Sequence, residues 1–113
     1  MLDSVTSLAL SSALDGLALR QRTIANNIAN INTVDYHAKV VSFENALAKS
    51  VADGDGASAA TTERSLEPTL ANGNNVNLDT ETLANIDALL RYQFAVKAIE
   101  APVSSIRAAM RTA

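Results

Sequence analysis

Apolar side chains recur at alternating spacings of three and four residues near both ends of this chain. Near the C-terminus the pattern has no gap, and this C-terminal seam comprises Leu89, Tyr92, Val96, Ile99, Val103, Ile106 and Met110. Near the N-terminus one position is vacant, at Gln21, and this N-terminal seam comprises Leu10, Leu14, Leu17, Ile24, Ile28 and Ile31. Because these spacings place each set along one side of an α-helix, the sequence predicts two long, coiled-coil-like helices.

The fold predicted from these patterns is all-α, with a single domain over residues 1–113. We expect terminal helices over residues 3–31 and 78–112, and a turn with a short helical element over residues 32–52. Residues 53–77 hold three of the four glycines, together with a proline and many small polar residues. Such a composition is typical of loops, so we expect a flexible loop there.

Three residues mark the expected helix limits. Ser42 is the candidate cap of the short element and Asp79 that of the second long helix, because short polar side chains accept hydrogen bonds from free backbone amides. Pro102 has no amide hydrogen and its ring crowds the preceding turn. We therefore predict a kink or a break of the second helix near residues 98–101.

Composition excludes most catalytic chemistry. The chain has no cysteine and a single histidine, His37, so disulfides, thiolate catalysis and cysteine-rich zinc sites are excluded. Nine basic and twelve acidic residues give a net charge of −3, which provides no positive field for nucleic acid. We expect no enzyme activity, no cofactor, no metal site, no nucleic acid and no small-molecule substrate. The first twelve residues lack a basic region, so we also expect no cleaved signal peptide.

Several large apolar residues lie off the two seams, among them Leu83, Ile86 and Leu90 in the second predicted helix. A pair of helices buries only one side of each helix, so a two-helix monomer could not cover these side chains. We therefore expect the chain to associate with other chains. The alternative is an ordinary helical hairpin that is stable alone.

Asparagine is unusually dense at the end of the first predicted helix, at Asn26, Asn27 and Asn30. Asparagine is a poor helix former, so some other interaction must compensate for three of them in five residues. Their amides could form hydrogen bonds across a helix contact and specify its register. Alternatively, they form a polar stripe that faces solvent at a fraying helix end.

Four segments together resemble the bacterial flagellar rod, hook and hook-associated proteins, and among them the proximal rod proteins of the basal body. The first runs from Leu19-Arg20 through Ala25–Asn30 to Asn32-Thr33 and Tyr36. The others are 42–47, 74–79 and 90–93. Where that family has Pro-Gly between the Thr and the Tyr, this chain has Val34 and Asp35. Because the family's turn needs a positive φ at the glycine, either Asp35 adopts that conformation or the turn changes type.

The resemblance implies a structural subunit of the flagellar basal body, exported by the flagellar type III apparatus and located in the periplasmic rod. There it would assemble helically and transmit motor torque. The implied partners are copies of itself, other rod proteins, and the membrane-ring and export-gate proteins. The alternative from another class is a small secreted or adaptor helical-hairpin protein that acts as a homodimer. We expect the subunit interface to comprise Leu10, Leu14, Leu17, Ile24, Asn26, Asn27, Ile28, Asn30, Ile31, Leu89, Tyr92, Val96, Ile99, Val103, Ile106 and Met110.

Overall fold

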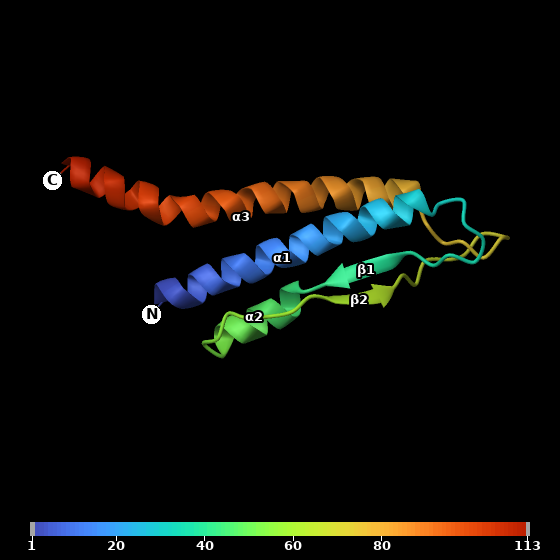
Figure 1. Cartoon of the computed structure of the whole chain (residues 1–113), viewed down its shortest axis with the longest axis horizontal. Coiled ribbons are helices and arrows are strands. Elements are labelled where there is room, and N and C mark those ends of the chain that lie inside the picture. Colours follow the sequence, from blue (N-terminus) through green and yellow to red (C-terminus); the bar gives the residue numbers. More distant parts are fainter. Residues whose placement is uncertain (1, 113) are drawn as a thin grey trace.

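Two long helices and a small hairpin region form an elongated molecule that measures 66 × 29 × 15 Å (Figure 1). The computed structural model describes the backbone of residues 2–112 and the side chains of residues 4–99. Its elements are α1 (Leu2–Ala29), β1 (Lys39–Ser42), α2 (Glu44–Ala52), β2 (Thr61–Arg64) and α3 (Leu78–Thr112).

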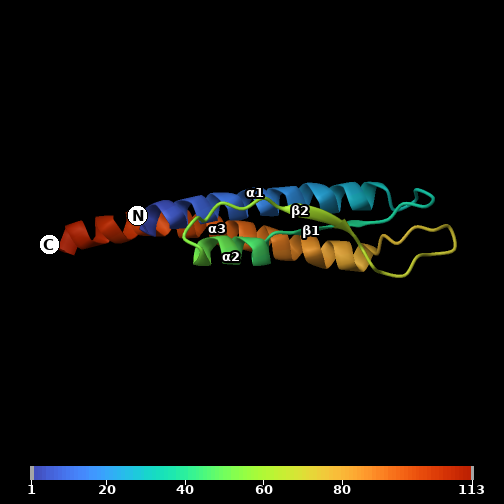
Figure 2. The same cartoon turned by 90° about the horizontal axis from the view of Figure 1, so that it is seen from below.

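Helix α1 is the element that the other parts of the fold share. Helix α3 runs antiparallel to α1 along one side, while β1 and α2 pack along another (Figure 2). The N-terminus and the C-terminal part of α3 therefore lie at the same end of the molecule. The segments that connect α1 to β1 and β2 to α3 lie together at the opposite end.

The all-α prediction is wrong, because the chain contains a two-stranded antiparallel sheet. Strand β1 pairs with β2 so that Lys39 lies opposite Arg64 and Ser42 opposite Thr61. Strand β2 falls inside the segment that we expected to be only a flexible loop. Its pair of β-branched threonines favours an extended backbone, and pairing with β1 satisfies the strand amides. A strand of four residues is too short to show a clear alternation of apolar and polar residues.

The helix limits differ from the expected caps. Asn77, not Asp79, caps α3: its Oδ1 accepts hydrogen bonds from the amides of Asp79 at 3.0 Å and Thr80 at 3.4 Å. Ser42 is the last residue of β1, and α2 begins at Glu44 without a side-chain cap. The backbone of α3 is helical without interruption from Leu78 to Thr112, so the helix does not break near residues 98–101, and the alternative of a kink there stays a prediction.

The apolar core is small and lies where α1, β1 and α2 meet. Leu17, Val41 and Phe43 are buried there, and Tyr92 of α3 packs against them. Gly16 makes this packing possible, because a Cβ atom at that position would lie only 2.6 Å from the Phe43 ring. The helix therefore tolerates a glycine, which is otherwise unfavourable in its interior by about 1 kcal/mol relative to alanine.

Helix α3 packs against the rest of the molecule through small side chains. Ala88 and Ala95 are its buried apolar residues among the side chains that the structure describes. They are seven residues apart and so lie on the same side of the helix. Alanine lets two helix backbones approach closely, but several larger side chains of α3, such as Leu83 and Phe94, stay exposed.

Candidate functional site

Three buried asparagines, Asn27, Asn74 and Asn75, form an asparagine junction where the end of α1 meets the beginning of α3. The side chains of Asn27 and Asn74 are fully buried, and that of Asn75 is 3% exposed. A buried amide is stable only when its donors and acceptors are paired. Among the described side chains, every buried polar atom has a hydrogen-bond partner.

Asn27 connects α1 to the first residue of β1 by binding both the amide and the carbonyl group of that residue, as the backbone of a neighbouring strand does. Its Nδ2 donates to the carbonyl oxygen of Lys39 at 2.8 Å, and its Oδ1 accepts from the Lys39 amide at 3.0 Å. The Tyr36 hydroxyl also donates to Oδ1, and Nδ2 donates to Glu81 Oε1 at 3.2 Å. One side chain therefore joins α1, β1 and α3.

Asn74 holds the turn that follows α1. Its Nδ2 donates to the carbonyl oxygens of Asn30 at 2.9 Å and Thr33 at 2.7 Å. Its Oδ1 accepts from the Val76 amide at 2.8 Å. Both carbonyl groups lie in the turn that follows α1 and also accept from backbone amides of that turn, so the Asn74 amide ties the turn to the segment before α3.

Asn75 connects the segment before β1 to the segment after β2. Its Oδ1 accepts from the Ala38 amide at 2.6 Å, and its Nδ2 donates to the carbonyl oxygens of Ser65 and Glu67 at 3.2 and 3.1 Å. The three asparagines thus fix backbone segments that are far apart in the sequence, at the end of the molecule drawn on the right in Figure 1.

The turn after α1 has the backbone conformation that the sequence made possible. Asp35 has a φ of 59°, so it takes the left-handed conformation expected at the position of the family's glycine. Its amide donates to the carbonyl oxygen of Asn72 at 2.9 Å. Gly73 packs directly against Asp35, with no room for a side chain. The rebuilt turn is therefore held against the loop that leads to the junction.

Glu81 places a carboxyl group inside the junction, where its residue is 7% exposed. Burial raises the pKa of Glu81, because water no longer stabilises the charged form. The hydrogen bond from Asn27 lowers this pKa, and the nearby charge of Glu67 raises it. Desolvation is the largest of these effects, so the ionised carboxylate is a cost to the folded state.

An arginine clamp, formed by Arg20, Glu44 and Arg91, ties α2 to both long helices. Arg20 donates to the two carboxylate oxygens of Glu44 at 2.7 Å each and to the Val41 carbonyl oxygen at 2.8 Å. Its guanidinium lies 4.8 Å from the centroid of the Phe43 ring. Arg91 of α3 approaches Glu44 at 3.4 Å. The hydrogen bond from Arg20 lowers the pKa of Glu44 to about 2.

Next to the clamp, an apolar groove of about 550 Å³ runs between α1, α2 and α3. Leu10, Leu47 and Val51 are among its lining residues, and Phe94 of α3 also borders it. None of the residues of α2 is buried. The clamp and Phe43 therefore hold α2 in place over a surface that is not filled.

The residues predicted at the subunit interface fall into three groups. Leu17, Ile24 and Asn27 are buried inside the chain itself, whereas Asn26, Leu89 and Ile99 are exposed. Partly exposed are Leu10, Leu14, Ile28, Asn30, Ile31, Tyr92 and Val96. The side chains of Val103, Ile106 and Met110 lie outside the described residues. The contact of these residues with neighbouring subunits stays a prediction.

The expectation that apolar side chains off the seams would remain uncovered is confirmed in α3. Leu83 is 68% exposed, Ile86 52% and Leu90 60%. Phe94, at 77%, extends the same surface. Leu83, Asp87, Leu90, Phe94 and Lys97 follow each other at spacings of four and three residues, so they share one side of the helix. We call these five residues the outer stripe.

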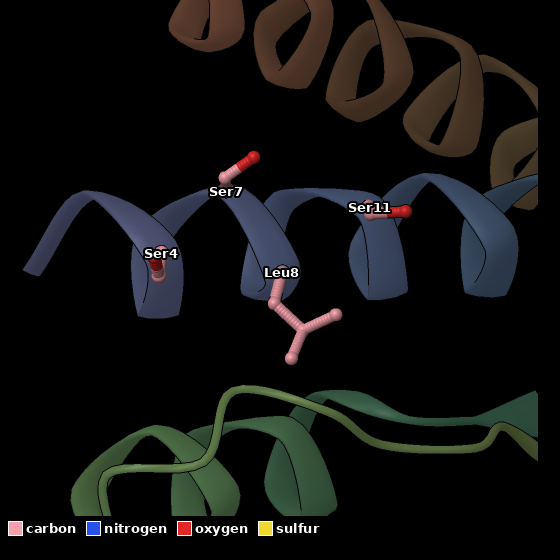
Figure 3. Close-up of a pocket in the computed structure, with 4 residues that line it drawn as sticks. All are labelled: Ser4, Ser7, Leu8 and Ser11. Carbon is pink, nitrogen blue, oxygen red and sulfur yellow. The ribbon is translucent and has the colours of Figure 1, made fainter. Parts of the chain in front are cut away.

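A second hollow lies along the N-terminal half of α1, where Ser4, Ser7, Leu8 and Ser11 line a space of about 670 Å³. Figure 3 shows Leu8 pointing toward α2 and the loop that follows it, while Ser7 points away from them. Among the side chains that the structure describes, this hollow is lined by three serines and a leucine, with no base beside a serine that could act as a nucleophile.

Between residues 4 and 99, no three His, Cys, Asp or Glu side chains gather to hold a metal ion. Within the described helices, no stretch is long and apolar enough to cross a membrane.

Sequence reasoning missed Asn74, Asn75, Arg20, Glu44 and Glu81 as functional side chains. The available signal was that all except Glu81 lie inside the segments of family resemblance. Asparagine is also dense before α3, and asparagines in loops commonly bond to nearby backbone groups. Each of the two alternatives for the N-terminal asparagines holds for one residue. Asn27 forms hydrogen bonds across the helix contact, while Asn26 faces solvent.

Comparison with known proteins links this sequence to one family. A family profile described as "Flagella basal body rod protein" matches residues 8–37, which cover most of α1 and the turn after it. The Flagellar basal body rod protein FlgB of Bacillus subtilis (strain 168) is 30% identical over 115 residues, and the match covers 87% of each chain. These similarities indicate a structural role in the flagellar basal body and not an enzymatic one. The chain therefore belongs to the flagellar basal body rod protein family.

Proposed function

We propose that this chain is a subunit of the proximal part of the flagellar rod, exported by the flagellar type III apparatus and assembled helically to transmit motor torque. The observation that carries the proposal is the uncovered apolar surface of α3 in a chain of this family. Leu83, Leu89 and Phe94 are all exposed in the single chain. Exposed apolar patches of this kind mark surfaces that other proteins cover.

The seams supply the contacts of the assembled state. Leu89 and Ile99 of the C-terminal seam are exposed and therefore available to neighbouring subunits. Asn26 is exposed on α1 and could form hydrogen bonds across such a contact. Leu17 and Ile24 have a different role, because they are covered within the chain and hold α1 to its own neighbours.

The shape supports transmission of torque. Two antiparallel helices, 28 and 35 residues long, run along the main axis of the molecule. The asparagine junction fixes them to each other at one end, through hydrogen bonds that depend on direction and distance. A helix pair fixed in this way resists sliding of one helix along the other.

The small core supports export in an unfolded state. Few of the large apolar side chains that the structure describes are buried, and no disulfide can form because the sequence has no cysteine. Such a chain is of marginal stability alone and is easily unfolded. Contacts with partners then add to the stability of the folded form. Those partners are copies of the chain, other rod proteins, and proteins of the membrane ring and the export gate.

The test is motility in a bacterium that carries this gene. Deleting the gene should abolish filaments and swimming, and the wild-type gene should restore both. L89D should be exported yet fail to support rod growth, because it places a charge in the proposed contact. The matched control is L66D, because Leu66 is 99% exposed in the segment after β2. Swimming by the deletion strain, or normal swimming by L89D cells, would overturn the proposal.

A further inference from the structure

The outer stripe has an order of charges that is complementary to itself. Its apolar members Leu83, Leu90 and Phe94 are exposed, and Ile86 extends the apolar surface at its side. Asp87 lies in the half of the stripe nearer the start of α3, and Lys97 lies in the half nearer its end. Both charged side chains are exposed.

We propose that the free chain forms a two-fold symmetric pair in which the outer stripes of two copies pack against each other in antiparallel orientation. In the register that this order of charges selects, Asp87 faces Lys97 of the second copy, and Leu90 faces Phe94 of the second copy. The two-fold axis repeats both contacts, so the pair contains two ion pairs and two Leu–Phe contacts. The same surface serves both copies, as in most homodimers.

The charges exclude the parallel arrangement in register. There Asp87 would face Asp87 and Lys97 would face Lys97, and like charges in contact are unfavourable. Polar residues within an otherwise apolar helix seam are known to fix register and orientation at some cost in stability. Asp87 already bonds to Arg91 of its own helix at 2.9 Å, and its second carboxylate oxygen can accept from the incoming lysine.

This pair differs from the assembly contacts proposed above, although it covers Leu83 and Phe94 of the same exposed surface of α3. A two-fold pair closes on itself and cannot extend into a filament. It would therefore cover the outer stripe of the free subunit and would have to separate before the subunit is incorporated. The surface contributes four large apolar side chains from each copy, which is a small interface, so we expect a dissociation constant on the order of 10–100 μM.

Sedimentation equilibrium of the full chain tests the pair through its charges. D87K and K97D should each raise the dissociation constant by about ten-fold or more, because each places like charges in both contacts. An equimolar mixture of D87K and K97D should form heterodimers with a dissociation constant close to that of the wild type. In such a mixture each lysine faces an aspartate again, although neither variant pairs with itself.

Two control variants separate the proposal from general effects. D55K makes the same change of charge in the exposed segment after α2, and L66S removes an exposed apolar side chain outside the stripe, as F94S does within it. Only D87K, K97D and F94S should weaken the pair, and circular dichroism should show unchanged helix in all variants. A wild-type chain that is monomeric up to millimolar concentration, a pair unaffected by these three changes, open-ended oligomers, or no recovery in the mixture would each overturn the proposal.

Discussion

The asparagine junction and the outer stripe differ in whether their side chains find contact partners within the single chain. At the junction, Asn27 is fully buried, yet its side-chain amide has hydrogen-bond partners on β1, on α3 and in the segment between α1 and β1. Along the outer stripe, Leu83, Leu90 and Phe94 have no such cover in the single chain. The residue types are the reverse of the usual arrangement, in which polar groups face water and apolar groups lie inside.

The difference shows which part of the molecule has all its contacts within the single chain. Hydrogen bonds of the junction position the end of α1, the start of β1 and the start of α3 with little apolar area. Apolar side chains that would otherwise build a larger core are left on the surface of α3. The fold therefore depends on directional polar contacts within the chain and leaves apolar side chains of α3 exposed, where the contacts between chains proposed above would cover them.

The largest effect is expected from removing the junction's central amide. N27A leaves the part-buried amide and carbonyl groups of Lys39 without their partner and also opens a cavity where the fully buried Asn27 side chain was. We expect a loss of about 3 kcal/mol in the free energy of unfolding, measured by urea denaturation. The control is N26A, because Asn26 is exposed on the neighbouring position, and its loss should be below about 0.5 kcal/mol. Equal losses for the two variants would show that the junction does not stabilise the fold.

Sequence periodicity predicted the two long helices because each repeats its apolar pattern over several turns. It did not predict β1 and β2, since four residues provide too little pattern and their stability comes from pairing across the sequence. The caps were misjudged for a related reason. Asn77 and Asp79 are both suitable caps by residue type, and only the three-dimensional contacts select Asn77.

The candidate site was predicted in part. The apolar side chains off the seams indicated an uncovered surface on α3, and their exposure confirms it. The role of Asn27 could be stated only as one of two possibilities, because a sequence does not say which side of a helix faces a partner. Asn74 and Arg20 were not predicted as functional, since their partners are backbone groups and charges that lie far away in the sequence.

A smaller effect is expected at the arginine clamp, which borders the open groove. E44Q removes the charge that bonds to Arg20 through both oxygens. The side chain of Glu44 is 41% exposed, so solvent screens the pair, and we expect a loss of about 1 kcal/mol at neutral pH. The pKa of Glu44 is lowered from 4.5 to about 2, so its stabilisation is present above pH 4.5 and is lost as the pH falls through about 2.

Thermal unfolding over that range of pH checks this prediction. The stability difference between wild type and E44Q should be constant above pH 4.5 and should disappear as the pH falls to about 2. E63Q is the control for the loss of one negative charge, because Glu63 is exposed on β2. A difference that grows in acid would contradict the assignment of the clamp.

The smallest effect, of opposite sign, is expected at Glu81 inside the junction. Burial raises the pKa of this carboxyl group, so the folded state binds the proton more tightly than the unfolded state does. Stability associated with Glu81 is therefore complete below its unfolded pKa and is lost as the pH rises through the raised folded value. E81Q keeps an oxygen that can accept from Asn27 and cannot ionise. We expect it to be more stable than the wild type by about 0.5 kcal/mol at neutral pH.

Comparing E81Q with E44Q sharpens the contrast between the completed junction and the open side of the molecule. The advantage of E81Q over the wild type should grow as the pH rises from acid to neutral, whereas the deficit of E44Q should appear over the same change. Both variants remove one negative charge, so a general effect of net charge would move them in the same direction. If E81Q is more stable than the wild type and E44Q less stable, each stability change is due to the local surroundings of that carboxylate. Stability changes of the same sign would refute the burial of an ionised carboxylate at Glu81.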